Sequence, residues 1–483
     1  MPNGLTAREP ACAEPARGGI TDEPALRRQL GALDLTLVGI GSTIGAGIFV
    51  LAGTAAAQWA GPAVSLSFAL AALGCLCGAL CYAELAVLMP QAGSAYTYTY
   101  VAAGPFAGWL VGWNLVLEYL VCASTVAVGW SAYFSDLLGQ MGIHLPSEYS
   151  NAPLAFDGSS HLVATGAVLN LPAAGIVLFL TALVLVGIGT TARANNLMVW
   201  VKTGIVLLVI VCGAAYVHPS NWHPFIPQNT GGEFGRFGFS GVLRGAALMF
   251  FAYIGFDTVS TLGQESRRPQ RDLPIGLLAS LAICAVLYVA MAAVMTGMVS
   301  YQKLGVANPI NVALAQAGPA LAWLLPLVGI GAVVGLASAV LASILGQSRI
   351  FYAMARDGLL PRLFMKIHPR FATPLAGTLI VGGAAALIAG LFPIEVLGEL
   401  VSIGTLVAFM SVCINVLIMR RTHASQPRIF RVPWSPFVPS LGVLCCVVMM
   451  VSLPSATWIR LLVWVIIGLI IYGLLRRRRA GSP

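Results

Sequence analysis

Long apolar runs alternate with short polar connections along almost the whole chain, and this pattern predicts an all-α integral membrane protein. A helix that crosses a bilayer needs ~20 consecutive, mostly apolar residues. By that measure we expect about twelve membrane-spanning helices, near residues 35–56, 62–88, 106–137, 163–188, 194–216, 238–262, 273–299, 321–352, 374–392, 396–419, 436–453 and 456–475.

The composition agrees with a membrane protein. Hydrophobic residues make up 58% of the 483 positions and charged residues 9%, which is too few charges to solvate the surface of a soluble domain. We therefore expect one transmembrane domain over residues 35–475. Residues 1–34 lack an apolar core with a cleavage site, so they are expected to form a cytoplasmic N-terminal tail and not a signal peptide. Residues 476–483 are expected to form a cytoplasmic C-terminal tail.

Basic residues predict the orientation. Most of the 26 Lys and Arg residues lie in connections on the same side as the N-terminus, and such residues accumulate in cytoplasmic loops. We therefore expect a multi-pass protein of the cell membrane with both termini in the cytoplasm. The net charge of +9 follows from this topology, so nucleic acid is not an expected partner.

The positions of the cysteine and histidine residues do not indicate a metal site. Nine of the ten cysteines lie in or beside spans, without the spacing of a metal site. We expect no metal, no cofactor and no disulfide, and the sequence leaves the oligomeric state open.

The first span contains four glycines in nine positions, in GIGSTIGAGIF at 39–49. Glycine weakens a helix interior, and an opened helix at membrane depth must be buried in protein or line a cavity. Amides freed at the start of the second half-helix would suit a carboxylate. The alternative is that Gly41 and Gly45 merely permit close helix packing.

A second interruption lies in the sixth span, in FFAYIGFD at 250–257. Broken spans at corresponding places in two halves indicate an inverted-repeat transporter with its site at the midplane. We therefore expect a 5+5 inverted-repeat fold with discontinuous helices 1 and 6. Repeat one would cover about 35–216, repeat two about 238–419, and two extra helices about 436–475.

Seven segments carry a family resemblance: GIGSTIGAGIFVLAG (39–53), ALCYAEL (79–85), PQAGSAYTY (90–98), GWNLVLEY (112–119), FFAYIGFDTVST (250–261), ESRRPQRDLP (265–274) and RIFYAMARDGLLP (349–361). Over residues 25–475 the chain resembles the cationic amino acid transporter family of the amino acid, polyamine and organocation (APC) superfamily. The resemblance implies a twelve-helix permease with the LeuT-like arrangement, which holds an amino acid between the broken helices.

The resemblance also implies which residues bind the substrate. It places the carboxylate at Thr43, Gly45, Ala46 and Gly47, and the ammonium and side-chain end at Phe250, Ala252, Tyr253 and Ile254. The chemistry agrees, because free amides donate to a carboxylate and released carbonyls accept from an ammonium. Packing in the core is the favoured expectation for Phe251. Cys122, Ala123 and Ser338 are further candidates to face the cavity.

Lys202 lies several residues into the fifth span. A lysine within a membrane is costly and usually functional, and its protonation changes readily when it is buried. The resemblance implies that its ammonium lies near the carbonyls of the broken first helix, where sodium-coupled relatives bind sodium, and this implies proton coupling. The alternative is a side chain that extends to the cytoplasmic interface.

Glu84, Glu118, Asp257 and Glu399 are carboxylates in or near spans. Glu118 and Asp257 are candidates to pair with Lys202, relay a proton or neutralise a cationic substrate, and Asp257 is expected mainly to anchor the broken sixth helix. Glu84 and Glu399 lie near span ends, where solvation at the interface is expected.

Together these features predict a secondary active amino acid permease and not an enzyme. It would work by alternating access and couple to protons through Lys202, with an amino acid, protons and the lipid bilayer as its partners. One alternative is an exchanger for cationic amino acids in which Lys202 is structural. Another, of a different class, is an amino acid sensor that keeps the fold without transport.

Overall fold

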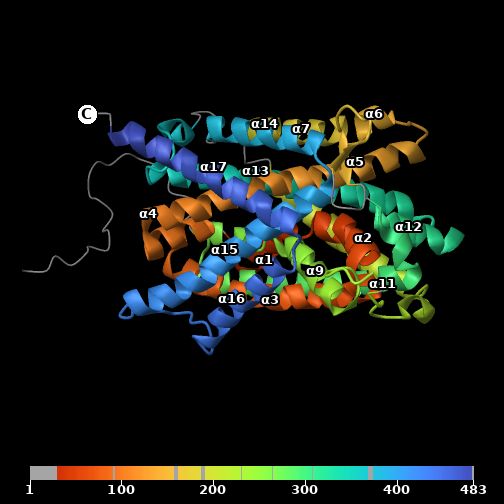
Figure 1. The fold of residues 1–483 in the computed structure, drawn as a ribbon, viewed down its shortest axis with the longest axis horizontal. Helices are drawn as coiled ribbons and strands as arrows, with labels where there is room; N and C mark the ends of the chain where they lie inside the picture. The colour runs from red at the N-terminus through yellow and green to blue at the C-terminus, as the bar shows by residue number, and fades with distance from the viewer. Residues whose placement is uncertain are drawn as a thin grey trace, which may run out of the picture.

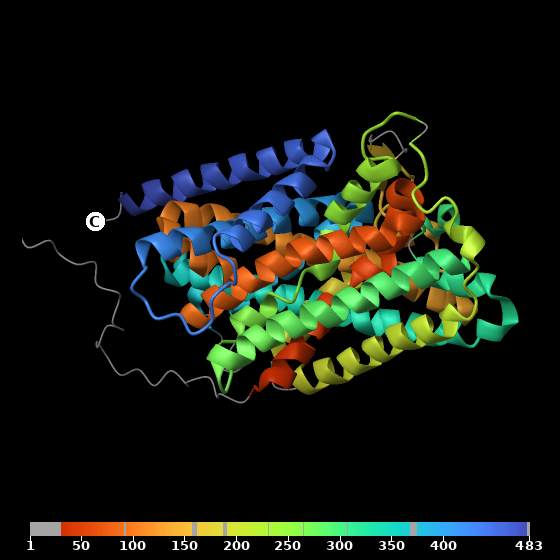
Figure 2. The same ribbon diagram turned by 90° about the horizontal axis from the view of Figure 1, so that it is seen from below.

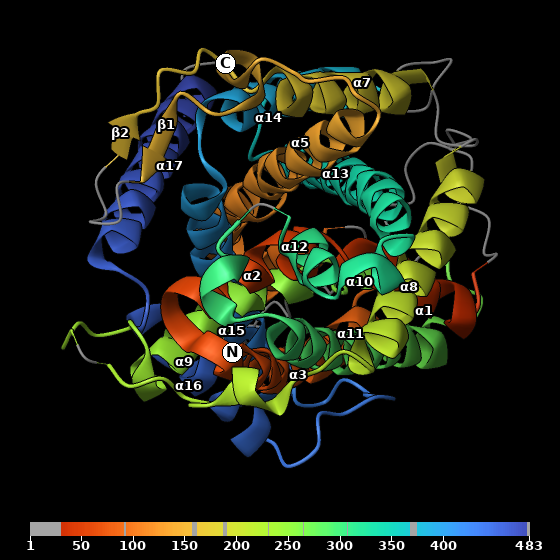
Figure 3. The same cartoon turned by 90° about the vertical axis from the view of Figure 1, so that its right-hand side faces the viewer.

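The computed structural model describes residues 30–90, 93–156, 162–186, 191–229, 231–263, 265–306, 308–367 and 374–480. Its long helices run roughly along one direction and pack into a bundle (Figures 1 and 2). Seen along that direction, the hairpin of β1 (Leu154–Phe156) and β2 (Leu162–Ala164) lies at the periphery (Figure 3). The bundle is therefore built almost wholly from helices.

The helices follow the order of the expected spans. The first half of the bundle contains α1 (Ala32–Thr43), η1 (Gly47–Leu51), α2 (Ala52–Ala55), η2 (Ala56–Ala60), η3 (Gly61–Ala63), α3 (Val64–Leu88), α4 (Ser94–Val116), η4 (Leu117–Val121), α5 (Cys122–Gln140), α6 (Ser147–Ser150), α7 (Leu171–Val186), α8 (Thr191–Ala214) and η5 (Pro219–Trp222). The second half contains α9 (Gly238–Met249), η6 (Phe250–Tyr253), α10 (Thr258–Thr261), α11 (Pro269–Met298), η7 (Tyr301–Leu304), α12 (Pro309–Gln316), η8 (Gly318–Leu321), α13 (Leu324–Arg356), η9 (Arg362–Met365), α14 (Leu375–Leu391), α15 (Ile394–Thr422), α16 (Phe437–Val451) and α17 (Ser455–Ala480).

Most of these helices have membrane dimensions. Among the described residues, eight helical stretches are long and apolar enough to cross a bilayer, and four further apolar helices, α1, α7, α14 and α16, are shorter. Gly47–Leu88 joins the second part of span one to span two, with a turn at Gly61, which adopts φ +62°. The prediction of an all-α membrane protein is confirmed.

One span boundary was predicted wrongly. The span expected at 163–188 begins only at Leu171, because Asn170 caps α7 by accepting the N–H of Ala173 at 3.1 Å. The span expected from residue 106 is preceded by a further helical stretch from Ser94, and the two meet at a kink where Gly104 adopts φ +88° and ψ 178° just before Pro105.

The observed helices do not test the other predicted domain boundaries. Residues 1–29 of the predicted N-terminal tail and 481–483 of the C-terminal tail lie outside the described residues. The division into repeats of about 35–216 and 238–419 stays a prediction. Below, the end of the bundle that holds the start of α1 is called the inner end, and the opposite end the outer end.

Both predicted breaks are present. The first helix ends at Thr43, and Ile44 is extended with ψ 101° before helix resumes at Gly47. In the sixth span, Ile254 turns to ψ 138° and Gly255 adopts φ +115° between η6 and α10. A side chain at Gly255 would be strained by that φ and would meet the carbonyl of Ser42. The two breaks therefore pack directly against each other.

Glu84 and Glu399 are buried and paired, so the prediction that both are solvated is wrong. Glu84, at the inner end of α3, is 2% exposed. Its carboxylate accepts two hydrogen bonds from Arg420, at 3.0 and 2.5 Å, and one from the N–H of Val432 at 2.7 Å. Arg428 lies 3.3 Å away. The network ties α3 to the end of α15 and the segment after it.

Removal of this carboxylate should destabilise the fold. In Glu84→Ala, two guanidinium groups lose their partner, and breaking a buried pair in this way costs ~3–5 kcal/mol. We expect a matching fall in the free energy of unfolding, measured by denaturation of the protein purified in detergent. The matched control is Glu233→Ala, whose pair with Arg236 is exposed and is worth at most ~1 kcal/mol. Equal effects of the two substitutions would contradict this assignment.

Candidate functional site

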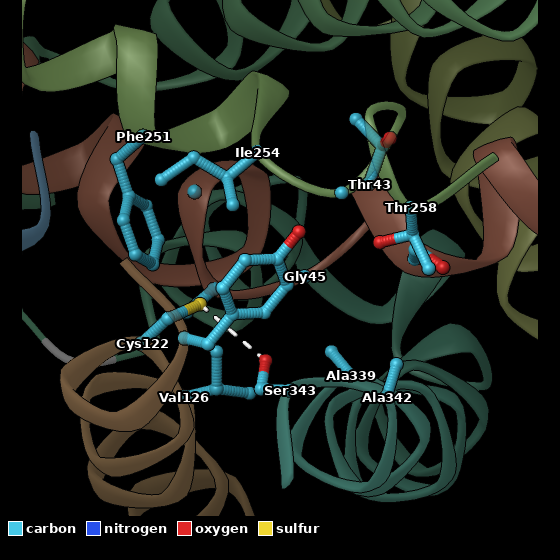
Figure 4. Close-up of a pocket in the computed structure, with 15 residues that line it drawn as sticks. Thr43, Gly45, Cys122, Val126, Phe251, Ile254, Thr258, Ala339, Ala342 and Ser343 are labelled. Carbon is cyan, nitrogen blue, oxygen red and sulfur yellow. Dashed lines mark hydrogen bonds between the residues drawn. The ribbon is translucent and has the colours of Figure 1, made fainter. Parts of the chain in front are cut away.

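A small cavity lies where the two breaks meet (Figure 4). Its volume is about 20 Å³, roughly the room of one water molecule. The residues that line it are Ser42, Thr43, Gly45, Ala46, Gly47, Tyr119, Cys122, Val126, Phe251, Ile254, Gly255, Thr258, Ala339, Ala342 and Ser343. An amino acid does not fit in this space, so the cavity must widen to admit a ligand.

The four glycines of the first span have two separate roles. A Cβ at Gly39 would meet Ser280 of α11, and a Cβ at Gly41 would meet Val199 of α8, so these two permit close helix packing. Gly45 and Gly47 instead line the cavity. The packing alternative thus applies to Gly41 but not to Gly45.

The predicted carboxylate-binding residues all belong to the cavity lining. Thr43, Gly45, Ala46 and Gly47 all line it. The first N–H groups of the helical segment that begins at Gly47 have no acceptor within that segment, and of these the N–H of Phe49 donates instead to the carbonyl of Gly45 at 3.4 Å. The start of this helical segment therefore offers backbone donors and the positive end of a helix dipole.

Of the four predicted residues of the sixth span, one lines the cavity. Ile254 lines the cavity, but Phe250, Ala252 and Tyr253 do not. Phe250 packs edge-on against Phe409, and the Tyr253 hydroxyl donates to the carbonyl of Phe68 at 3.0 Å. Because successive side chains of a helical turn point in different directions, only part of this segment can face one cavity.

Ala252 and Phe251 occupy different positions in the sixth span relative to the cavity. Ala252 lies against Gly47, where an added Cβ would overlap its Cα and Cβ. Phe251, which was expected to pack in the core, lines the cavity together with a second aromatic side chain, Tyr119, and Figure 4 shows the Phe251 ring above Cys122 and beside Ile254.

Lys202 is buried and binds the end of α1. Its ammonium donates to the carbonyls of Gly41 and Ile44, the latter at 2.9 Å, and to Ser338 Oγ at 2.9 Å. The Tyr288 hydroxyl donates to the carbonyl of Thr43 at 2.8 Å. The carbonyls left open at the end of the helix are thus held by side chains of α8 and α11, and the alternative of a lysine that extends to the interface is wrong.

Asp257 and Glu118 do not line the cavity, and neither is paired with Lys202. Asp257 accepts a hydrogen bond from the Tyr119 hydroxyl at 2.5 Å and from the N–H of Gly255 at 3.1 Å, so it braces the second break. Glu118 lies in the π-helical turn η4, is fully buried, and makes no side-chain hydrogen bond among the described residues.

The sequence did not indicate eight of the lining residues: Ser42, Tyr119, Val126, Gly255, Thr258, Ala339, Ala342 and Ser343. Those on η4, α5 and α13 follow helical spacing, and Figure 4 shows the α13 residues on one face of that helix. Cys122 lines the cavity as expected and receives a hydrogen bond from Ser343 at 3.7 Å, whereas Ala123 does not line it and Ser338 binds Lys202 instead.

The cavity combines backbone polarity with a mostly apolar side-chain lining. Val126, Phe251, Ile254, Ala339 and Ala342 supply apolar surface, and no Asp, Glu, Lys or Arg is among the described residues that line it. This lining suits a ligand with a charged, backbone-recognised head and an apolar tail.

Comparisons with known proteins give consistent results. A family model described as "Amino acid permease" matches residues 30–472. The chain is 44% identical over 457 residues to a methylthioribose transporter of Bacillus subtilis, covering 94% of this chain and 95% of that protein. It is also 44% identical over 459 residues to the branched-chain amino acid permease BcaP of the same organism, covering 95% of each. Identity to the human cationic amino acid transporter 4 is 36% over 407 residues, covering 84% of this chain and 62% of that protein.

Proposed function

Because the chain belongs to the amino acid permease family, we propose that it is a secondary active permease that moves amino acids across the cell membrane by alternating access. It is a transport protein and not an enzyme. The observation that carries the proposal is the small cavity at the meeting point of two broken helices. Amides after the first break suit a carboxylate, and carbonyls near the second suit an ammonium.

The proposed substrates are neutral amino acids with a small or branched apolar side chain. The apolar lining supports this class, as does the lack of a carboxylate among the described lining residues. A cationic side chain would need a new partner, because Asp257 is already bound by Tyr119 and Glu118 lies outside the cavity. This weighs against the alternative of an exchanger for cationic amino acids.

Relatives at equal identity carry different substrates in their names, methylthioribose and branched-chain amino acids. A sugar has neither the carboxylate nor the ammonium that the two broken ends match. The backbone chemistry therefore favours an amino acid for this chain.

A competition panel tests the substrate class. Unlabelled amino acids and methylthioribose would each compete with one labelled transported amino acid in proteoliposomes. We expect alanine, valine, leucine and isoleucine to reduce uptake at least ~10-fold, while arginine, lysine and methylthioribose at equal concentration leave it unchanged, because burying an uncompensated charge costs several kcal/mol. Competition by arginine as strong as that by leucine would overturn the assignment.

We further propose proton symport through Lys202. Its ammonium is held by two backbone carbonyls and one hydroxyl, and no carboxylate of the described residues lies in ion-pair contact with it. When the proton leaves, the neutral amine donates weaker hydrogen bonds to the carbonyls of Gly41 and Ile44. The end of α1 is then held less firmly. Because the same break carries the proposed carboxylate site, proton and substrate occupancy would be linked.

The orientation is also part of the proposal. Arg420 and Arg428 lie at the same end of the bundle as the start of α1, in agreement with a cytoplasmic inner end. An amino acid sensor with this fold would bind the same ligands but show no uptake, so uptake by proteoliposomes separates the two functions.

A further inference from the structure

A cluster of charged side chains lies at the outer end of the bundle and is centred on Glu399 of α15. Its carboxylate accepts a hydrogen bond from Thr457 at 2.7 Å, and the guanidinium groups of Arg460 and Arg244 lie at 3.3 and 3.5 Å. Glu399 is buried, and the two arginine side chains are 24% and 19% exposed. Three helices that are distant in sequence, α9, α15 and α17, therefore meet at one carboxylate.

Arg244 has a second partner on the first broken helix. Its guanidinium lies over the ring of Trp59 in η2, 4.8 Å from the centroid. The carbonyl of Trp59 accepts the N–H of Phe237 at 2.8 Å, and a Cβ at Gly241 would overlap that carbonyl. Thus η2 and α9 pack as one unit, and we call this unit, with η1 and η6, the roof of the cavity.

The roof rests directly on α15. Gly398, next to Glu399, faces Leu51 of η1 and Leu248 of α9, with the nearest carbon atoms 3.2 and 3.6 Å from where its Cβ would be. Ser402, one turn further on, donates to the carbonyl of Leu248 at 3.3 Å. Both broken helices therefore contact the face of α15 that carries Glu399.

From this geometry we propose that the Arg244–Glu399 pair is the outer gate of the transporter, which holds the roof closed and separates when the cavity opens outward. The inference rests on the proposed transport function. A cavity of about 20 Å³ cannot load from the outer end unless the roof moves away from α15. The pair is partly solvated, so it holds the closed state more firmly than an exposed pair and can still be released as water enters.

A native cysteine allows the gate to be measured. Cys122 lines the cavity beneath the roof, and the described cysteines all lie within helices. A membrane-impermeant methanethiosulfonate carrying a trimethylammonium group, added outside intact cells, reaches Cys122 only when the roof opens. We expect Arg244→Gln to speed labelling about tenfold, the change in open population that a ~1.4 kcal/mol shift gives. Cys122→Ser supplies the background.

Two further variants separate a gate from a general loss of packing. Arg236→Gln removes the same charge from an exposed pair at the outer end and should label as the wild type does. Glu399→Gln breaks the gate from the other side, and the double variant with Arg244→Gln should label no faster than the faster single variant, because the two groups act through one contact. If Arg244→Gln does not fold, the labelling of Glu399→Gln decides.

The outcomes distinguish the gate from the transport function. Suppose that the wild type exchanges substrate in proteoliposomes but the gate variants label at the wild-type rate. The gate proposal would then be wrong, and the transport proposal would stand. A wild type that moves no amino acid would overturn the transport proposal, whatever the labelling rates.

Discussion

Gly47→Val should abolish transport. The added side chain begins where a Cβ would overlap the Cα and Cβ of Ala252, and this neighbour is backbone that cannot turn aside. The two breaks must separate, and a displacement of ~1 Å at a functional site can cost ~100-fold in rate. We expect uptake of a labelled neutral amino acid by proteoliposomes to fall at least ~100-fold.

Two control variants make this result specific to the site. Gly383→Val places the same side chain on α14, where a Cβ meets nothing within 4 Å, and should transport normally. Gly45→Ala brings a methyl group 3.5 Å from Ala339, an ordinary contact, so the protein should fold while its cavity narrows and its apparent affinity falls. Normal uptake by Gly47→Val would contradict the proposal that the substrate carboxylate binds to backbone amides at the first break.

Lys202→Ala should separate binding from proton coupling. The substitution leaves the amides after the first break in place but removes the donor to the carbonyls of Gly41 and Ile44. We expect the variant to exchange internal for external substrate, yet to lose the accumulation that an inward proton gradient drives. In the wild type, acidification outside should raise uptake, because each proton that enters favours the entry of substrate. The variant should show no such rise.

The measurement compares uptake at several external pH values with the internal pH fixed. Ser338→Ala is a milder companion, because it removes one of the three acceptors of the ammonium and leaves the lysine in place. It should keep proton-driven accumulation with a shifted pH dependence. A Lys202→Ala protein that accumulates substrate like the wild type would assign the lysine a structural role only.

The two breaks could be predicted from sequence because clustered glycines weaken a helix interior and a carboxylate is costly inside a bilayer helix. The cost of an unpaired backbone group in hydrocarbon makes such residues informative one by one, so the breaks and the buried Lys202 follow from local composition. The family resemblance added that Lys202 binds near the first break, and its contacts with Gly41 and Ile44 agree with this.

The orientation of individual side chains could not be predicted in the same way. Phe250 and Phe251 are adjacent and chemically identical, yet only Phe251 lines the cavity. Which one turns inward depends on the path of a short irregular segment between Met249 and Gly255, and hydropathy does not encode that path. The lining face of α13 was missed for a related reason, since small residues such as Ala339 and Ala342 occur on every face of an apolar helix.

Ion pairs between helices that are distant in sequence were also not predicted. Glu84 and Glu399 are close to span ends, where a single sequence cannot distinguish a solvated carboxylate from a paired one. Their partners Arg420 and Arg244 lie more than a hundred residues away in the chain, so only the packing of α15 against α3 and α9 brings them together. Long-range pairing of this kind depends on tertiary structure, and local patterns carry no signal for it.

The central claim is that the broken helices bind an amino acid whose entry is coupled to a proton. Its most direct test is uptake of labelled leucine by proteoliposomes of the purified protein, with an inward proton gradient and without one. The account predicts accumulation above the external concentration only with the gradient, and its collapse when a protonophore is added. Uptake could instead be the same with and without the gradient and require unlabelled amino acid inside the vesicles. That result would contradict proton symport and identify an exchanger.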